Sequence, residues 1–175
     1  PFGDKQHRRK CDKAAGSQSP QTLFGTPVAL MFFEVTSRLL DAGVHLPMHR
    51  VGDRQRTVLE VYPGFAARQL IGRNSYKSDQ SESQTGLRTA YRQDWFVALT
   101  GQSGSDRFGF DIHATLNVES DPMGDALDAL ICATQAAWGW RAGYVDLFAG
   151  AVDPVEGWIA DPALILPLQT DNVEP

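Results

Sequence analysis

The sequence predicts an α/β domain, in which strands and helices alternate along the chain. Three observations predict it: a β-branched apolar run at 57–62 and helical apolar spacing at 28–40 and again at 121–140. This alternation is typical of a central sheet flanked by helices. The 175 residues are 42% hydrophobic and 21% charged, as expected for one globular domain. We therefore expect a single domain over 1–175, with a flexible tail at 168–175.

The first part of the chain predicts one helix and one strand. Residues 4–20 are polar, and we expect a solvated helix or an ordered loop there. Thr26 and Pro27 supply an N-cap and a first-turn proline for a helix over 28–40. The run at 57–62 predicts a strand that is buried on both faces of the sheet.

The second part of the chain predicts further helices. In order, we expect a short helix over 65–71, a polar loop over 74–83, a helix over 86–99 and a flexible connector over 101–106. Residues 108–112 fit either a short strand or an irregular packing segment. Asp121-Pro122 begins the most regular helix, which runs to about residue 138 or 140. Residues 157–160 fit a closing edge strand or an extended segment.

Composition restricts the classes of function. The net charge of −5 argues against broad, salt-driven nucleic-acid binding, but only weakly against a metal-dependent nuclease. The two cysteines, Cys11 and Cys132, make neither a disulfide framework nor a zinc site, which favours a reducing cytoplasm. The longest apolar run, at 28–33, is too short to span a bilayer, so we expect no membrane association. The start at Pro1 lacks an initiator methionine, and we expect upstream sequence.

Glu60 is the unusual residue of the predicted strand. An unpaired carboxylate inside Val-Leu-Glu-Val-Tyr is costly to bury. Glu60 therefore either points to solvent, pairs with an arginine, or serves as a metal ligand or general base at the end of a strand.

Asp125 and Asp128 share one face of the late helix, because they are three positions apart. Asp121 lies a turn earlier and is explained by helix capping, which also partly explains Asp125. Asp128 lies within the apolar run at 126–130, where capping explains it poorly. Together with Glu60, these oxygen donors fit Mg²⁺ or Mn²⁺. No zinc ligand pattern, phosphate loop or nucleophilic serine motif is present in the sequence.

Several motifs carry a family resemblance. In order, they are Arg9-Lys10-Cys11-Asp12, Val58-Leu59-Glu60-Val61-Tyr62-Pro63, Tyr76-Lys77, Gly124-Asp125-Ala126-Leu127-Asp128-Ala129-Leu130 and Glu156-Gly157-Trp158-Ile159. With this order and spacing, the chain resembles a bacterial and archaeal domain of unknown function (four-twenty-nine), described as a predicted nuclease of the RNase H fold. The segment at 124–130 is also similar to the last catalytic motif of RNase-H-like Holliday-junction resolvases.

The resemblance implies a mixed central sheet flanked by helices, with an N-terminal strand and its acid lying before Pro1. It also implies a two-metal phosphodiesterase acting on DNA or RNA, with Glu60 as the middle acid and Asp125 and Asp128 as the final pair. Low-weight candidates for substrate contacts are Arg9, Asp12, Lys77, Arg88 and Arg92.

Two other functions stay open. The same fold can serve a non-catalytic binding or scaffold protein, which the acidic total charge favours slightly. Phosphotransfer is a third alternative, because the sugar-kinase and actin superfamily shares this core fold. That chemistry requires glycine-rich phosphate loops and a second domain, and the sequence displays neither.

Overall fold

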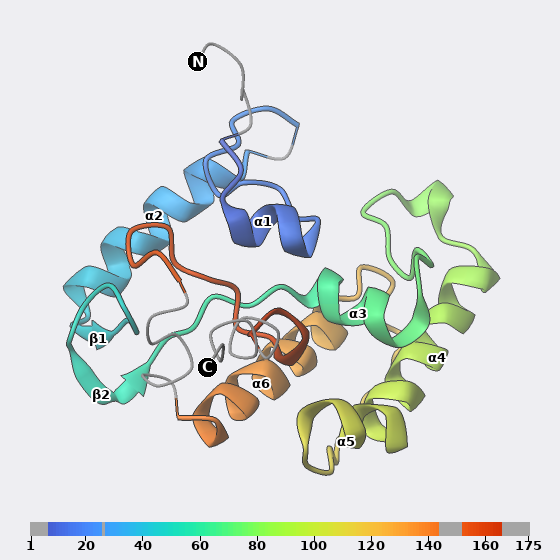
Figure 1. Cartoon of the computed structure of the whole chain (residues 1–175). Coiled ribbons are helices and arrows are strands. Elements are labelled where there is room, and N and C mark those ends of the chain that lie inside the picture. The colour runs from blue at the N-terminus through green and yellow to red at the C-terminus, as the bar shows by residue number, and fades with distance from the viewer. Residues whose placement is uncertain (1–6, 26, 144–151, 166–175) are drawn as a thin grey trace. The chain divides into compact units, whose positions relative to one another are not determined.

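A computed structural model of the chain describes residues 7–25, 27–143 and 152–165, and the predicted tail at 168–175 lies outside them. In chain order, its elements are α1 (Lys10–Ala15), α2 (Val28–Asp41), β1 (Val44–His45), β2 (Asp53–Thr57), α3 (Pro63–Ile71), the 3-10 helix η1 (Ser81–Ser83), α4 (Gly86–Thr100), α5 (Gln102–Phe108) and α6 (Asp125–Arg141) (Figure 1). The prediction of a mixed α/β protein is confirmed.

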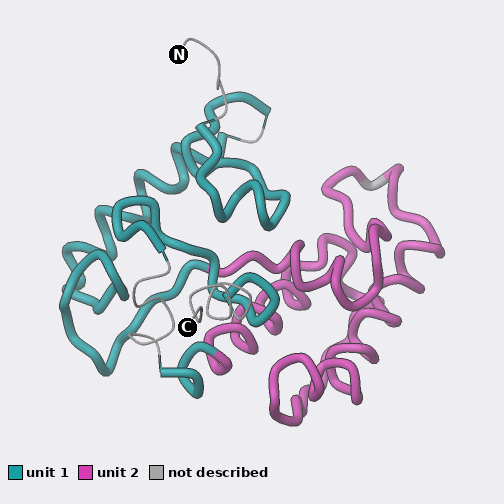
Figure 2. Tube along the Cα trace, in the orientation of Figure 1, with its two compact units in different colours: residues 1–60, 139–175 teal, residues 61–138 magenta. Residues whose placement is uncertain are grey.

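The chain divides into two compact units (Figure 2). Unit 1 combines residues 1–60 with 139–175, and unit 2 is the continuous stretch 61–138. Each unit is described by itself below.

The sheet of unit 1 has two parallel strands, β1 and β2, with an irregular register between Val44 and His45. The prediction of a strand over 57–62 that is buried on both faces is wrong: β2 ends at Thr57, residues 58–62 form no strand, and none of the six is buried. Beyond it, single backbone bonds join Val58 N to the His45 carbonyl (3.0 Å) and Ala160 N to the Glu60 carbonyl (2.8 Å). The apolar run therefore lies beside other segments without forming a continuous ladder.

Helices α1 and α2 of unit 1 differ in burial. The polar stretch is not simply solvated over its described part, 7–20, since α1 buries Cys11, Asp12 and Ala15. The predicted helix over 28–40 is confirmed as α2, yet none of its residues is buried, and Phe33 is 73% exposed. The segment at 157–160 forms no strand, and it buries Ile159 and Ala160.

Unit 2 is built from helices, with α3 packed against α4 and α4 against α5. The helices predicted at 65–71 and 86–99 are confirmed as α3 and α4, and Thr85 caps α4 by accepting a bond from Arg88 N. The connector predicted at 101–106 is instead helix α5. Gly104 allows this turn, because a Cβ there would lie 1.8 Å from the Leu99 carbonyl oxygen. Phe108 ends α5, and residues 109–112 are irregular and bury Ile112.

Helix α6 supplies much of the buried surface of unit 2. It begins at Asp125, four residues later than predicted, and Leu127, Ile131 and Trp138 are buried on its expected apolar face. Asp121 accepts bonds from the backbone N–H groups of residues 125–127 at 3.0–3.3 Å, as capping predicts. Asp128 therefore lies in the first turn of a helix that Asp121 caps. No helix in the described ranges combines the length and apolar character that a membrane span requires.

Candidate functional site

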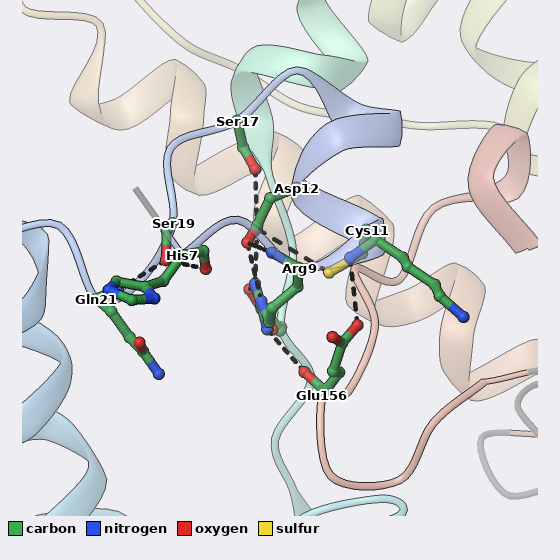
Figure 3. Close-up of polar contacts among 10 residues, drawn as sticks. His7, Arg9, Cys11, Asp12, Ser17, Ser19, Gln21 and Glu156 are labelled. Atoms are coloured by element: carbon green, nitrogen blue, oxygen red, sulfur yellow. Dashed lines mark hydrogen bonds and ion pairs between the residues drawn. The ribbon is translucent and has the colours of Figure 1, made fainter. Parts of the chain in front are cut away.

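Arg9 is the centre of a polar cluster in unit 1, which we call the Arg9 cluster: Arg9, Asp12, Glu60 and Glu156. Figure 3 shows Arg9 beside Asp12 and Glu156. Its guanidinium binds Asp12 through Nε (3.1 Å) and Nη2 (2.8 Å). The same group binds Glu60 through Nη1 (2.8 Å) and Nη2 (2.5 Å). The Nη1 group also donates to the Glu156 carbonyl at 3.1 Å. One fork of donors thus holds two carboxylates, a geometry that suits arginine better than lysine.

Local structure places these side chains. Arg9 is the N-cap of α1, and its backbone N–H donates to Asp12 at 2.9 Å, which closes a capping box. Ser17 donates a further bond to Asp12 at 3.1 Å, and the Glu156 carboxylate accepts from Lys10 N at 3.2 Å. Asp12 is only 1% exposed, whereas the Glu60 side chain is 43% exposed. The Arg9 cluster is therefore buried at Asp12 and open at Glu60.

The charges of the cluster stabilise each other. Burial alone lowers the pKa of Arg9, but its hydrogen bonds with Glu60 and Asp12 outweigh burial and raise that pKa. Burial likewise raises the pKa of Asp12, yet the bonds from the Arg9 side chain and backbone hold it below its ordinary value. Burial raises the pKa of the adjacent Cys11 thiol to about 11. The cluster is an ion network that favours the charged forms of Arg9 and Asp12.

Asp128 is the centre of a second cluster, in unit 2, which we call the Asp128 cluster: Tyr76, Lys77 and Asp128. The Tyr76 hydroxyl donates to Oδ1 of Asp128 at 2.6 Å, and Lys77 Nζ donates to Oδ2. Gly124 makes room for this contact, because its φ is +73° and a Cβ there would lie 3.2 Å from the Tyr76 and Lys77 side chains. Burial, followed by the hydrogen bond to Asp128, raises the pKa of Tyr76. The phenol is therefore held as a proton donor to the carboxylate.

The remaining predicted residues differ in their surroundings. Asp125 is exposed at the start of α6, three positions from Asp128. Arg88 donates to the Ser83 carbonyl. Arg92 is only 2% exposed and donates to the carbonyls of Val118 (2.8 Å) and Tyr76 (3.0 Å). These contacts give Arg92 a structural role, and its expected phosphate contact stays a prediction.

The predicted metal ligands bring the right chemistry, since carboxylate oxygens suit Mg²⁺ and Mn²⁺. Two of them, Asp125 and Asp128, lie in unit 2, while Glu60 lies in unit 1. Over the described ranges, no three His, Cys, Asp or Glu side chains form a group that could hold a metal ion. The convergence of Glu60 with Asp125 and Asp128 stays a prediction.

The sequence did not point to two of the groups that contact the acids. Tyr76 and Glu156 both lie inside the motifs that carried the family resemblance, but neither was assigned a contact. The sequence could have indicated the Tyr76 contact, because a tyrosine directly before a lysine places a hydrogen-bond donor beside a cation.

The protein is therefore a mixed α/β protein with two clusters of carboxylates and cations, the Arg9 cluster and the Asp128 cluster. Residues 2–153 match the family described as "Protein of unknown function (DUF429)", and the chain belongs to this family. Neither the curated proteins nor the solved structures include a match to the chain.

Proposed function

We propose that the protein is a metal-dependent nuclease with an RNase-H-like core. The proposed ligands of a divalent cation, Mg²⁺ or Mn²⁺, are Glu60, Asp125 and Asp128. Such a cation supplies an activated water and stabilises the leaving oxygen in phosphodiester hydrolysis. Lys77 and Arg88 are the candidate phosphate contacts, on DNA or RNA.

The observation that carries the proposal is the way in which two neighbouring side chains hold the carboxylate of Asp128. Its two oxygens are held by a buried tyrosine and a half-exposed lysine, and the exposed carboxylate of Asp125 lies one turn away. A carboxylate that is oriented by outer partners and open on one side is the usual form of a metal ligand in proteins. An ammonium beside it also suits a substrate with a negative charge.

The Arg9 cluster supports a second candidate function, a non-catalytic binding or scaffold protein. Arg9 already satisfies both oxygens of Glu60, so that acid needs no metal to compensate its charge. In this alternative, Glu60 and Asp12 hold α1 in place and take part in no reaction.

Calorimetry with Mn²⁺ separates the two candidates. The full chain is titrated with Mn²⁺ as the wild type and as Glu60→Gln and Asp128→Asn, two changes that retain side-chain size. Matched controls are Glu119→Gln and Asp94→Asn, whose side chains are exposed. Under the nuclease proposal, Glu60→Gln and Asp128→Asn each weaken Mn²⁺ binding by more than about tenfold, and the controls leave it unchanged.

Cleavage assays complete the comparison. Single-stranded, double-stranded and branched DNA and RNA are incubated with the protein and Mn²⁺ or Mg²⁺. The nuclease proposal requires cleavage that EDTA stops and that Asp128→Asn reduces at least about 100-fold. If neither acid substitution changes Mn²⁺ binding and no substrate is cleaved, the nuclease proposal is wrong and the scaffold candidate is favoured.

A further inference from the structure

The two oxygens of Asp128 have partners of different kinds. The Oδ1 atom accepts from a neutral phenol, that of Tyr76, at 2.6 Å. The Oδ2 atom accepts from a cation, the ammonium of Lys77. The two partners are consecutive in sequence, but they differ in how firmly the surrounding structure holds them.

Tyr76 is held at three places. It is 6% exposed, and its ring stacks on Trp95 with centroids 5.5 Å apart and planes inclined by 10°. Its carbonyl accepts from the buried Arg92 at 3.0 Å. Moving the Tyr76 hydroxyl away from Oδ1 therefore requires repacking of the α4 side of unit 2. Oδ1 is a structurally fixed atom.

Lys77 is held much less firmly. Its side chain is 42% exposed, and that of Asp128 is 21% exposed. An ion pair this close to solvent contributes little, and a lysine ammonium on its flexible stem exchanges partners readily. Oδ2 is therefore the oxygen that another cation can reach without repacking.

We propose that Asp128 divides its work between its two oxygens: Tyr76 positions Oδ1, while Lys77 is an exchangeable counter-ion that leaves Oδ2 when a divalent cation binds there. The freed ammonium then lies beside the cation site, where it can pair with a phosphate oxygen of the substrate. This inference rests on the proposed metal site. It adds that Lys77 balances the charge of Asp128 until the divalent cation binds.

The test uses two substitutions with opposite expected signs, measured by Mn²⁺ calorimetry on the full chain. Lys77→Met removes the competing cation and should strengthen Mn²⁺ binding about threefold. Tyr76→Phe removes only the positioning hydroxyl and should weaken it about tenfold. If Tyr76 and Lys77 had purely structural roles, the two substitutions would not change the Mn²⁺ affinity in opposite directions.

Three controls isolate the effect. Lys77→Arg keeps the charge and should bind Mn²⁺ as the wild type does. Arg73→Met removes an exposed positive charge elsewhere in unit 2, and should leave the affinity unchanged. Tyr91→Phe makes the same chemical change as Tyr76→Phe at a half-buried position of α4, again without effect. If Tyr76→Phe fails to fold, the sign for Lys77→Met decides alone.

The outcomes distinguish the inference from the proposed function. If Asp128→Asn abolishes Mn²⁺ binding but Lys77→Met weakens it or leaves it unchanged, the exchange is wrong and the metal site stands. The exchange is also wrong if Arg73→Met strengthens binding as much as Lys77→Met, since total charge then explains the gain. If the wild type binds no Mn²⁺, or Asp128→Asn binds it normally, the proposed site and the inference both fail.

Discussion

Nη2 of Arg9 lies 2.5 Å from Oε1 of Glu60 and 2.8 Å from Oδ1 of Asp12. The same nitrogen therefore serves one acid that is open to solvent and one that is buried. Because the guanidinium is the only described side-chain cation that both acids share, the stability of unit 1 depends on it directly. The contacts of Arg9, and the buried groups Asp12, Cys11 and Arg92, lead to four predictions.

Replacing Arg9 with methionine should destabilise the protein by about 3 kcal/mol, because Asp12 is left buried without its charge partner. Urea denaturation measures the free energy of unfolding. Arg8→Met is the matched control, since Arg8 is exposed and its loss should cost less than about 0.5 kcal/mol. Equal effects at both positions would show that the Arg9 cluster contributes nothing.

Stability should fall in acid through Asp12. The pKa of Asp12 is held below its ordinary value of 3.8 in the folded protein, so the unfolded chain takes up a proton first as the pH falls. The stabilisation is fully present above the unfolded pKa and is lost as the pH falls through the lower folded pKa. Urea midpoints from pH 6 to pH 2 should decline more steeply in the wild type than in Asp12→Asn. Parallel curves would contradict the assignment.

Cys11 should resist alkylation in the folded protein. It is fully buried, and burial raises its pKa to about 11, so roughly one thiol in a thousand is ionised at pH 8. Iodoacetamide followed by peptide mass spectrometry should find Cys132, which is half-buried, modified before Cys11. In urea, both cysteines should react. Rapid modification of native Cys11 would mean that α1 opens readily.

Replacing Arg92 with methionine should cost about 3 kcal/mol of stability, because the carbonyls of Val118 and Tyr76 lose a charged donor. Thermal or urea unfolding measures the loss. Arg73→Met serves as the exposed comparison and should change the free energy of unfolding by less than about 0.5 kcal/mol. A small effect for Arg92→Met would return Arg92 to the candidate substrate contacts.

Helices with a clear apolar period or cap were predictable from the sequence, and elements that depend on distant contacts were not. Asp121 was recognisable as the cap of α6, because capping is a local interaction. Helix α5 has no such period. The burial of Phe108 depends on the packing of α5 against α4.

Strands and ion pairs show the same limit. The run at 57–62 has strong β propensity, but a strand also needs a hydrogen-bonded partner, and that partner is set by the fold. Glu60 and Asp128 could be selected as unusual acids from their apolar neighbours. Their cations could not be assigned from spacing, because Arg9 and Lys77 each lie 51 positions away from the acid they bind.

The discontinuity of unit 1 has a consequence for synthesis on the ribosome. Arg9 reaches the Glu156 carbonyl across 147 positions, whereas every residue of unit 2 lies between 61 and 138. Translation therefore delivers the complete Tyr76–Asp128 pair before the last partner of Arg9 exists. During that interval, which lasts a few seconds at ordinary elongation rates of about 5–20 residues per second, α1 has its local capping box but lacks the contacts of Arg9 and Lys10 with Glu156. The order of emergence from the ribosome makes unit 2 the first of the two that can close.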